Sequence, residues 1–188
     1  MKCMWFIGAV FACGCALAVE IPDLCVRALR RALDSRAAWT MERRFAGSVR
    51  TLSTTGTVEC VIGNRIEWKV LHPFVSSVSM TTNAMVFLDE DGERVKNLDD
   101  LPYYREIRKR TDSFARGNAD AFDGLFEMDV DIRPDGAWSL EMKPENRAMR
   151  RLFSSATLEG NAKLESAVFK TKDGGISVIR FKELPRVR

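Results

Sequence analysis

The sequence predicts a mainly β protein with helices, of the α+β class, in which a curved antiparallel sheet forms an incomplete β-barrel covered by a helical lid. Three observations predict this fold. Apolar and polar residues alternate in many short segments, as in strands with one buried face. Asp-Gly pairs at 91–92, 135–136 and 173–174 separate several of these segments. Helical spacing is confined to the N-terminal region and the middle of the chain.

The first residues have the pattern of an export signal. Lys2 precedes an uncharged apolar run at residues 4–19, which ends in a small-x-small pattern at 16–18. A membrane-spanning helix needs roughly 20 apolar residues, so this run fits a secretory signal better. We therefore expect a cleaved signal peptide at residues 1–18 and a single exported domain at residues 19–188.

The cysteines leave alternatives open. An uncleaved N-terminal anchor, or a lipoprotein signal at Cys13 or Cys15, would replace the cleaved signal. Cys25 and Cys60 remain in the mature chain. In an oxidising compartment these two residues either form a disulfide or stay as separate buried thiols.

The N-terminal half begins with one helix and continues with strands. Pro22 and Asp23 suit a first helical turn, and we expect a helix at residues 21–36. The spacing then changes to two, with a tight turn at Gly63-Asn64. The expected strands lie at residues 39–45, 58–62, 66–70, 78–80 and 85–87.

The second half has a helical stretch followed by hairpins. We expect the lid at residues 98–117 and, after a break at Gly117-Asn118, at residues 119–125. Residues 126–132 alternate between apolar side chains and carboxylates, which predicts a strand with one wet face. Further strands are expected at 138–142, 164–171 and 176–181, with one or two helical turns at 146–153.

The residues that catalysis usually needs are missing or dispersed. His72 is the one histidine, and it lies beside Pro73 at a strand end. The sequence has no nucleophile elbow, phosphate-binding loop or dinucleotide fingerprint. The net charge of +3 is spread over short basic clusters, such as that at residues 105–110, which we interpret as solvated faces. We expect no enzyme activity, metal, cofactor or nucleic-acid partner.

The apolar side chains are therefore the informative ones. Methionine is flexible and polarisable, and suits surfaces that accommodate irregular apolar partners. An ordinary core is the alternative interpretation. The residues expected to line an apolar cavity are Trp39, Met41, Phe45, Trp68, Met80, Phe87, Met128, Val130, Trp138, Leu140, Met142 and Phe169.

Several motifs resemble the LolA-like outer-membrane lipoprotein carrier family, which has the LolA/LolB-type fold. They are the strand and turn at 65–74, the Phe-Ala-Arg-Gly-Asn segment at 114–118, and the Trp-x-Leu-x-Met-x-Pro strand at 138–144. Leu158-Glu159-Gly160 and the final strand after Gly174-Gly175 complete the series. Together these motifs run nearly the length of the mature chain.

The resemblance implies an incomplete β-barrel with an apolar cavity and a helical lid. It also implies a monomeric periplasmic carrier that shields lipoprotein acyl chains between an inner-membrane donor and an outer-membrane acceptor. A periplasmic binding module for another lipid or glycolipid on the same fold is the alternative. Residues expected at the lid and mouth are Arg43, Arg65, Ile107, Phe114 and Phe122.

Overall fold

The computed structural model describes residues 21–185 except 62, 117, 119–120, 123, 146, 148 and 152. The expected signal peptide at residues 1–18 lies outside this part of the chain. The helices are α1 (Asp23–Ala32) and α2 (Pro102–Ala115), with short 3₁₀ turns at Leu98–Asp100 and Met149–Arg151. The strands are β1 (Arg36–Arg44), β2 (Thr51–Val61), β3 (Arg65–His72), β4 (Ser76–Met80), β5 (Ala84–Asp89), β6 (Gly92–Asn97), β7 (Phe126–Ile132), β8 (Trp138–Pro144), β9 (Ser155–Gly160), β10 (Leu164–Lys170) and β11 (Ile176–Glu183).

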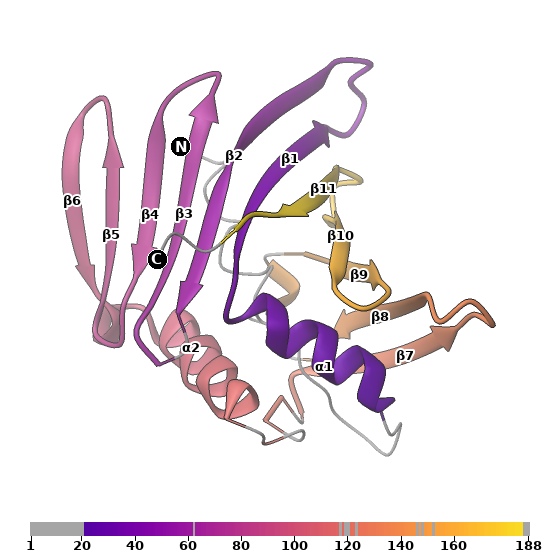
Figure 1. Cartoon of the computed structure of the whole chain (residues 1–188). Coiled ribbons are helices and arrows are strands. Elements are labelled where there is room, and N and C mark those ends of the chain that lie inside the picture. Colours follow the sequence, from indigo (N-terminus) through magenta and orange to yellow (C-terminus); the bar gives the residue numbers. More distant parts are fainter. Residues whose placement is uncertain are drawn as a thin grey trace.

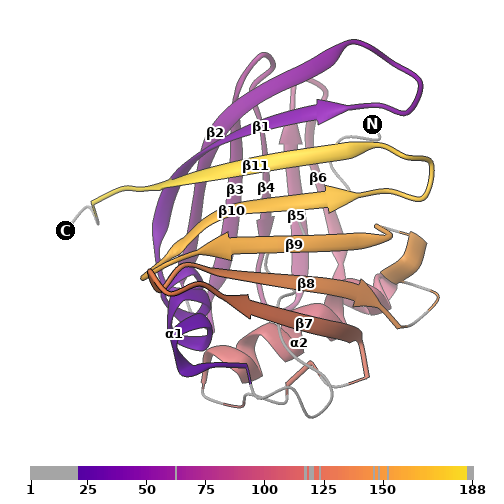
Figure 2. The same cartoon turned by 90° about the vertical axis from the view of Figure 1, so that its right-hand side faces the viewer.

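All described strands belong to one antiparallel sheet of 11 strands, in the order β6-β5-β4-β3-β2-β1-β11-β10-β9-β8-β7. The pairing of β1 with β11 joins the two halves of the chain. Strands β6 and β7 are the two edges, so the sheet is open, as the sequence predicts. The sheet bends around both helices, which lie at the end where β1 begins and β6 ends (Figures 1 and 2).

Helix α1 begins after Pro22, with Asp23 in its first turn and Arg30 and Arg31 in its last, so its charges complement the helix dipole. Its buried face consists of Cys25, Val26, Ala28 and Leu29. The helix is shorter than expected from the sequence. It ends at Ala32 and is capped by Leu33, because the chain turns there and Arg36 already pairs with Glu59 of β2.

Helix α2 has a proline in its first turn, where the missing N–H costs nothing. Ile107, Thr111 and Phe114 are buried at helical spacing against the sheet. The described residues of 119–125 form turns instead of the expected second helix, and Gly124 has a left-handed φ of 73° that helix geometry does not allow. Of the two helical segments expected at residues 98–117 and 119–125, the structure contains one, α2.

Two glycines make room for large side chains that extend from one strand over the backbone of its neighbour. Gly56 pairs with Trp39, and Gly160 pairs with Trp138. A Cβ at Gly56 would lie 2.6 Å from Trp39 Cζ2, and one at Gly160 would lie 2.9 Å from Trp138 Cζ2. Both indole rings therefore lie over strand backbone that carries no side chain, once in each half of the sheet.

Candidate functional site

The concave face of the sheet carries an apolar interior that runs through both halves of the molecule. Trp39 of β1 stacks on Trp68 of β3, with ring centroids 4.6 Å apart, and Phe181 of β11 meets Trp68 edge-on at 6.5 Å. In the other half, the ring centroid of Phe153 lies 6.0 Å from that of Phe126 and 5.6 Å from that of Phe169. One cluster of buried residues connects these groups with the apolar faces of α1 and α2.

Methionines are a consistent feature of this interior. The six methionines within the described residues are all buried, with 8% exposure or less. Met41, Met128, Met142 and Met149 belong to this interior, and Met80 and Met85 to a smaller cluster beside it. Each side chain has three rotatable bonds and a polarisable sulfur, so it adapts to neighbours of different shape. An interior built in this way repacks around a new apolar group at lower cost than one built from branched residues.

The buried polar atoms that make no hydrogen bond in the described part of the chain include Trp39 Nε1 and Thr54 Oγ1. Trp39 is 1% exposed and Thr54 is 8% exposed. The indole of Trp138 has the equivalent place in the other half, and its Nε1–H donates to Asn161 O at 2.7 Å. An unpaired buried donor costs about 1–3 kcal/mol, so Trp39 and Thr54 are two positions where an added acceptor would stabilise the protein.

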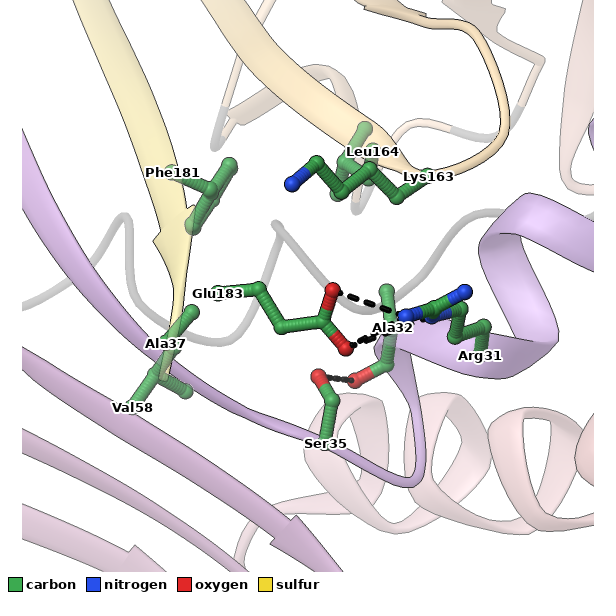
Figure 3. Close-up of a pocket in the computed structure, with 9 residues that line it drawn as sticks. All are labelled: Arg31, Ala32, Ser35, Ala37, Val58, Lys163, Leu164, Phe181 and Glu183. Atoms are coloured by element: carbon green, nitrogen blue, oxygen red, sulfur yellow. Dashed lines mark hydrogen bonds and ion pairs between the residues drawn. The ribbon is translucent and has the colours of Figure 1, made fainter. Parts of the chain in front are cut away.

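A small pocket leads from the surface toward the interior, where α1 ends and β11 ends (Figure 3). Its volume is about 30 Å³. The walls include Val58, Leu164 and Phe181, and Phe181 is the ring that contacts Trp68. The apolar walls therefore connect directly to the stacked tryptophans.

An ion pair spans this pocket. Arg31 Nη2 of α1 donates to both carboxylate oxygens of Glu183 at 2.9 Å, and its Nε donates to Oε1 at 3.2 Å. The two side chains are 56% and 32% exposed, so the pair stabilises the contact by no more than about 1 kcal/mol. This ion pair links the end of α1 to β11, and little free energy is needed to break it.

The structure places most of the residues expected to line a cavity together. Trp39, Met41, Trp68, Met80, Met128, Trp138, Leu140, Met142 and Phe169 are buried, and Phe87 and Val130 are half-buried. Met80 and Phe87 belong to a second, smaller cluster with Val78, Met85 and Tyr104. Phe45 is separate from both clusters. It is 42% exposed just beyond the end of β1, where the Arg43 guanidinium lies 4.7 Å from its ring centroid.

The expected lid and mouth residues divide into three groups. Ile107, Phe114 and Phe122 are buried, and the rings of Phe114 and Phe122 meet edge-on at 5.9 Å. Arg43 is half-buried and lies four residues from Trp39 in β1, so the two side chains are on the same face of the sheet. Arg65 is three residues from Trp68 in β3, so it lies on the opposite, convex face, within 3.7 Å of Glu59 and Glu67.

Sequence reasoning missed Thr54, Gly160 and the pair of Arg31 and Glu183. A glycine inside a strand pattern, as at 56 and 160, is a signal for close approach that would have located both tryptophans. The pairing of residues 31 and 183 has no local signal, because the two residues are 152 positions apart in the sequence.

The acidic residues, the histidine and the cysteines do not gather into one site in the described part of the chain. No group of three or more His, Cys, Asp or Glu side chains that could hold a metal is found there. The carboxylates of Glu127, Asp129 and Asp131 are exposed, as predicted for the wet face of that strand.

Cys25 and Cys60 are free, buried thiols, and burial raises the pKa of each above its ordinary value. No helix in the described residues is long and apolar enough to span a membrane.

No family model matches the sequence, and no curated protein matches it. Solved structures do match. A LolA superfamily protein from Nitrosomonas europaea has 12% identity over 91% of this chain and 96% of its own, with a TM-score of 0.45. A putative outer membrane lipoprotein-sorting protein domain from Vibrio parahaemolyticus has 10% identity over 88% and 93%, with a TM-score of 0.41. The chain is similar to LolA superfamily structures along most of its length.

A third match is the MucA/MucB complex of Pseudomonas aeruginosa. The identity is 13% over 85% of this chain and 54% of the matched chain, with a TM-score of 0.41.

Proposed function

We propose that this protein is a periplasmic carrier that shields lipoprotein acyl chains in the apolar interior of its open barrel and moves them from the inner toward the outer membrane, without enzymatic activity. The observation that carries the proposal is the continuous, methionine-rich interior of an open sheet, closed at one end by two small helices. The motifs that resemble the LolA-like carriers support the same function.

The energetics favour a carrier that exchanges its own side chains for cargo. Burying one methylene group contributes about 0.8 kcal/mol, so an acyl chain of roughly 16 carbons gains about 12 kcal/mol on leaving water. In this protein the interior is filled by the apolar faces of α1 and α2. Cargo that displaces these helix faces exposes them to water. The net free energy gained on loading is therefore smaller than the full transfer free energy of the acyl chain. A carrier needs this balance.

The two helices are proposed to act as one lid. Arg30 Nε of α1 donates to Phe114 O of α2 at 3.2 Å, and the Arg30 guanidinium lies 5.4 Å from the Phe114 ring centroid. The contact of α1 with β11 at Arg31 and Glu183 is exposed and weak. Opening at Arg31 and Glu183 would move both helices together and widen the pocket beside Phe181.

The two unpaired donors support a specific position for the cargo. An acylated lipoprotein carries ester and amide carbonyls where its acyl chains meet its polar part. A carbonyl oxygen beside Trp39 Nε1 and Thr54 Oγ1 would receive one or two hydrogen bonds in a site sheltered from water. The proposed arrangement places the hydrocarbon along the tryptophans and methionines and the carbonyls at the β1–β2 pair.

The test is to isolate the mature protein from the periplasm of a Gram-negative host and to identify bound molecules by native mass spectrometry before and after delipidation. Acylated peptides are the expected result. Free phospholipid or glycolipid would instead support the alternative cargo. A protein that carries no lipid, and whose tryptophan fluorescence is unchanged by a diacylated peptide, would contradict both carrier functions.

A matched pair of variants locates the site. Met128 and Asp129 are neighbours on β7, with Met128 buried in the interior and Asp129 exposed on the other face. Met128→Gln places a polar amide against the proposed acyl chains and is expected to weaken binding of the diacylated peptide. Asp129→Gln is expected to leave binding unchanged.

A further inference from the structure

A second cavity, of about 480 Å³, runs along the outer flank of α2. It lies between that helix, the β4–β5 turn at Thr82 and the segment that follows the helix at Asn118. The lining residues are Thr82, Arg105, Arg108, Lys109, Asp112, Ser113, Arg116 and Asn118. The residues from α2 are spaced three and four apart, so they form one continuous face of the helix.

Positive charge dominates this groove. Four of its lining side chains are cationic, and one is a carboxylate. Arg105 Nη1 pairs with Asp99 Oδ1 at 2.9 Å, outside the groove lining. Lys109 and Arg116 have no carboxylate within ion-pair distance among the described residues, so their charges are available to a ligand.

One of the cations that line the groove, Arg108, is buried and held in place by hydrogen bonds. The Arg108 side chain is 4% exposed, its Nε donates to Asp112 Oδ2 at 3.0 Å, and its Nη1 donates to Met80 O at 3.3 Å. These contacts fix the guanidinium in one orientation. A buried charge is retained only at a considerable desolvation cost, which distinguishes Arg108 from the mobile cations of an ordinary helix surface.

Neutral hydrogen-bonding groups complete the site. The side chains of Thr82, Ser113 and Asn118 line the same groove, and Asn118 Nδ2 donates to Ser113 Oγ at 3.1 Å. Guanidinium, ammonium, hydroxyl and amide groups therefore approach one volume from several directions. A tetrahedral anion with several oxygens uses such a set of donors better than a planar carboxylate does.

We propose that this groove binds a phosphate-bearing ligand, such as the phosphorylated head group of a lipid. The volume of the groove is in the range of small-molecule sites and exceeds what an inorganic anion needs. The assignment is independent of the carrier function, because none of the groove residues belongs to the apolar interior proposed to hold acyl chains.

The test is a calorimetric titration of the mature chain at low salt with inorganic phosphate, glycerol 3-phosphate and acetate. Saturable binding of both phosphates, weakened by added salt, is expected, with acetate binding more weakly. Tighter binding of glycerol 3-phosphate assigns the site to a head group, and equal affinity assigns it to free phosphate.

Variants test whether the phosphate binds in this groove. Lys109→Gln with Arg116→Gln is expected to raise the Kd by at least about tenfold, because charge-assisted hydrogen bonds are lost. The matched control removes two exposed charges elsewhere, with Arg27→Gln on α1 and Lys182→Gln on β11, and is expected to leave the Kd unchanged. If the double variant does not fold, Lys109→Gln alone is compared with Lys182→Gln.

Three results would overturn the assignment: no saturable binding of either phosphate, equal weakening in the control pair, or acetate binding as tightly as phosphate. Acyl-peptide binding by the same samples is measured in parallel. It reports on the carrier function separately, so failure of one proposal does not imply failure of the other.

Discussion

Gly56→Ala is the substitution that tests the geometry of the interior most sharply. A Cβ at this position would lie 1.8 Å from Lys69 O and 2.6 Å from Trp39 Cζ2. The first contact is with backbone of the neighbouring strand, so a side-chain rotation does not relieve it. Trp39 is held against Trp68 on one side and over Gly56 on the other, and it must also move.

Overpacking of a close-packed core costs about 1–3 kcal/mol, and a clash with fixed backbone falls at or above the upper end of this range. We therefore expect Gly56→Ala to lower the free energy of unfolding by at least about 3 kcal/mol, a large part of the stability of a domain of this size. The assay is urea unfolding followed by tryptophan fluorescence, with the midpoint and the slope measured separately.

The control is Gly47→Ala. Gly47 has a φ of 67°, and nothing lies within 4 Å of an added Cβ. Alanine there is expected to cost only the strain of a left-handed backbone, about 1–2 kcal/mol. If Gly56→Ala costs no more than Gly47→Ala, Trp39 does not lie over Gly56 and the described interior is wrong.

Three further predictions address charge, ionisation and ligand contacts. Arg108→Met is expected to lower the unfolding free energy by about 3–5 kcal/mol, because it leaves Asp112 and Met80 O without their buried partner; urea unfolding checks this, and a loss below 1 kcal/mol would show that Arg108 is solvated. Burial raises the pKa of the Cys60 thiol above its ordinary 9.0, so the unfolded chain loses this proton first and stability falls as the pH rises above about 9. Unfolding measured from pH 7 to 10.5 is expected to be less pH-dependent in Cys60→Ala, and an equal pH dependence would contradict the buried position. Thr54→Val is expected to reduce the preference for an ester-linked lipid over its ether-linked analogue by about fivefold, since only the ester offers a carbonyl to the hydroxyl; an unchanged preference would place the carbonyls elsewhere.

Alternation along the strands was sufficient to predict most of the sheet. It failed where a strand has no buried face. Strand β6 is an edge whose last five residues are exposed, so its sequence carries no period. Strand β9 buries Ala156, Leu158 and Gly160, and two of these residues are too small to give a strong apolar signal.

The strand face on which a candidate residue lies was predictable from the same alternation. The parity of Trp39, Met41 and Arg43 along β1 gave their common face correctly. The expectation for Arg65 was wrong for a reason visible in the sequence, because a residue three positions from Trp68 in a strand lies on the opposite face. Arg108 lies in a basic cluster that looks like a solvated helix surface, and its burial depends on Met80 of a distant strand.

The most direct test of acyl-chain carriage is NMR of the protein with ¹³C-labelled methionine methyl groups, titrated with a diacylated peptide. Met41, Met128, Met142 and Met149 lie in the interior, so their methyl groups report on that space, whereas Met80 and Met85 belong to the smaller cluster and serve as internal references. If the interior holds the acyl chains, large shift changes and nuclear Overhauser contacts to the acyl methylene groups are expected at Met41, Met128 and Met142. Binding of the peptide that leaves these methyl signals unchanged would contradict acyl-chain carriage in the interior.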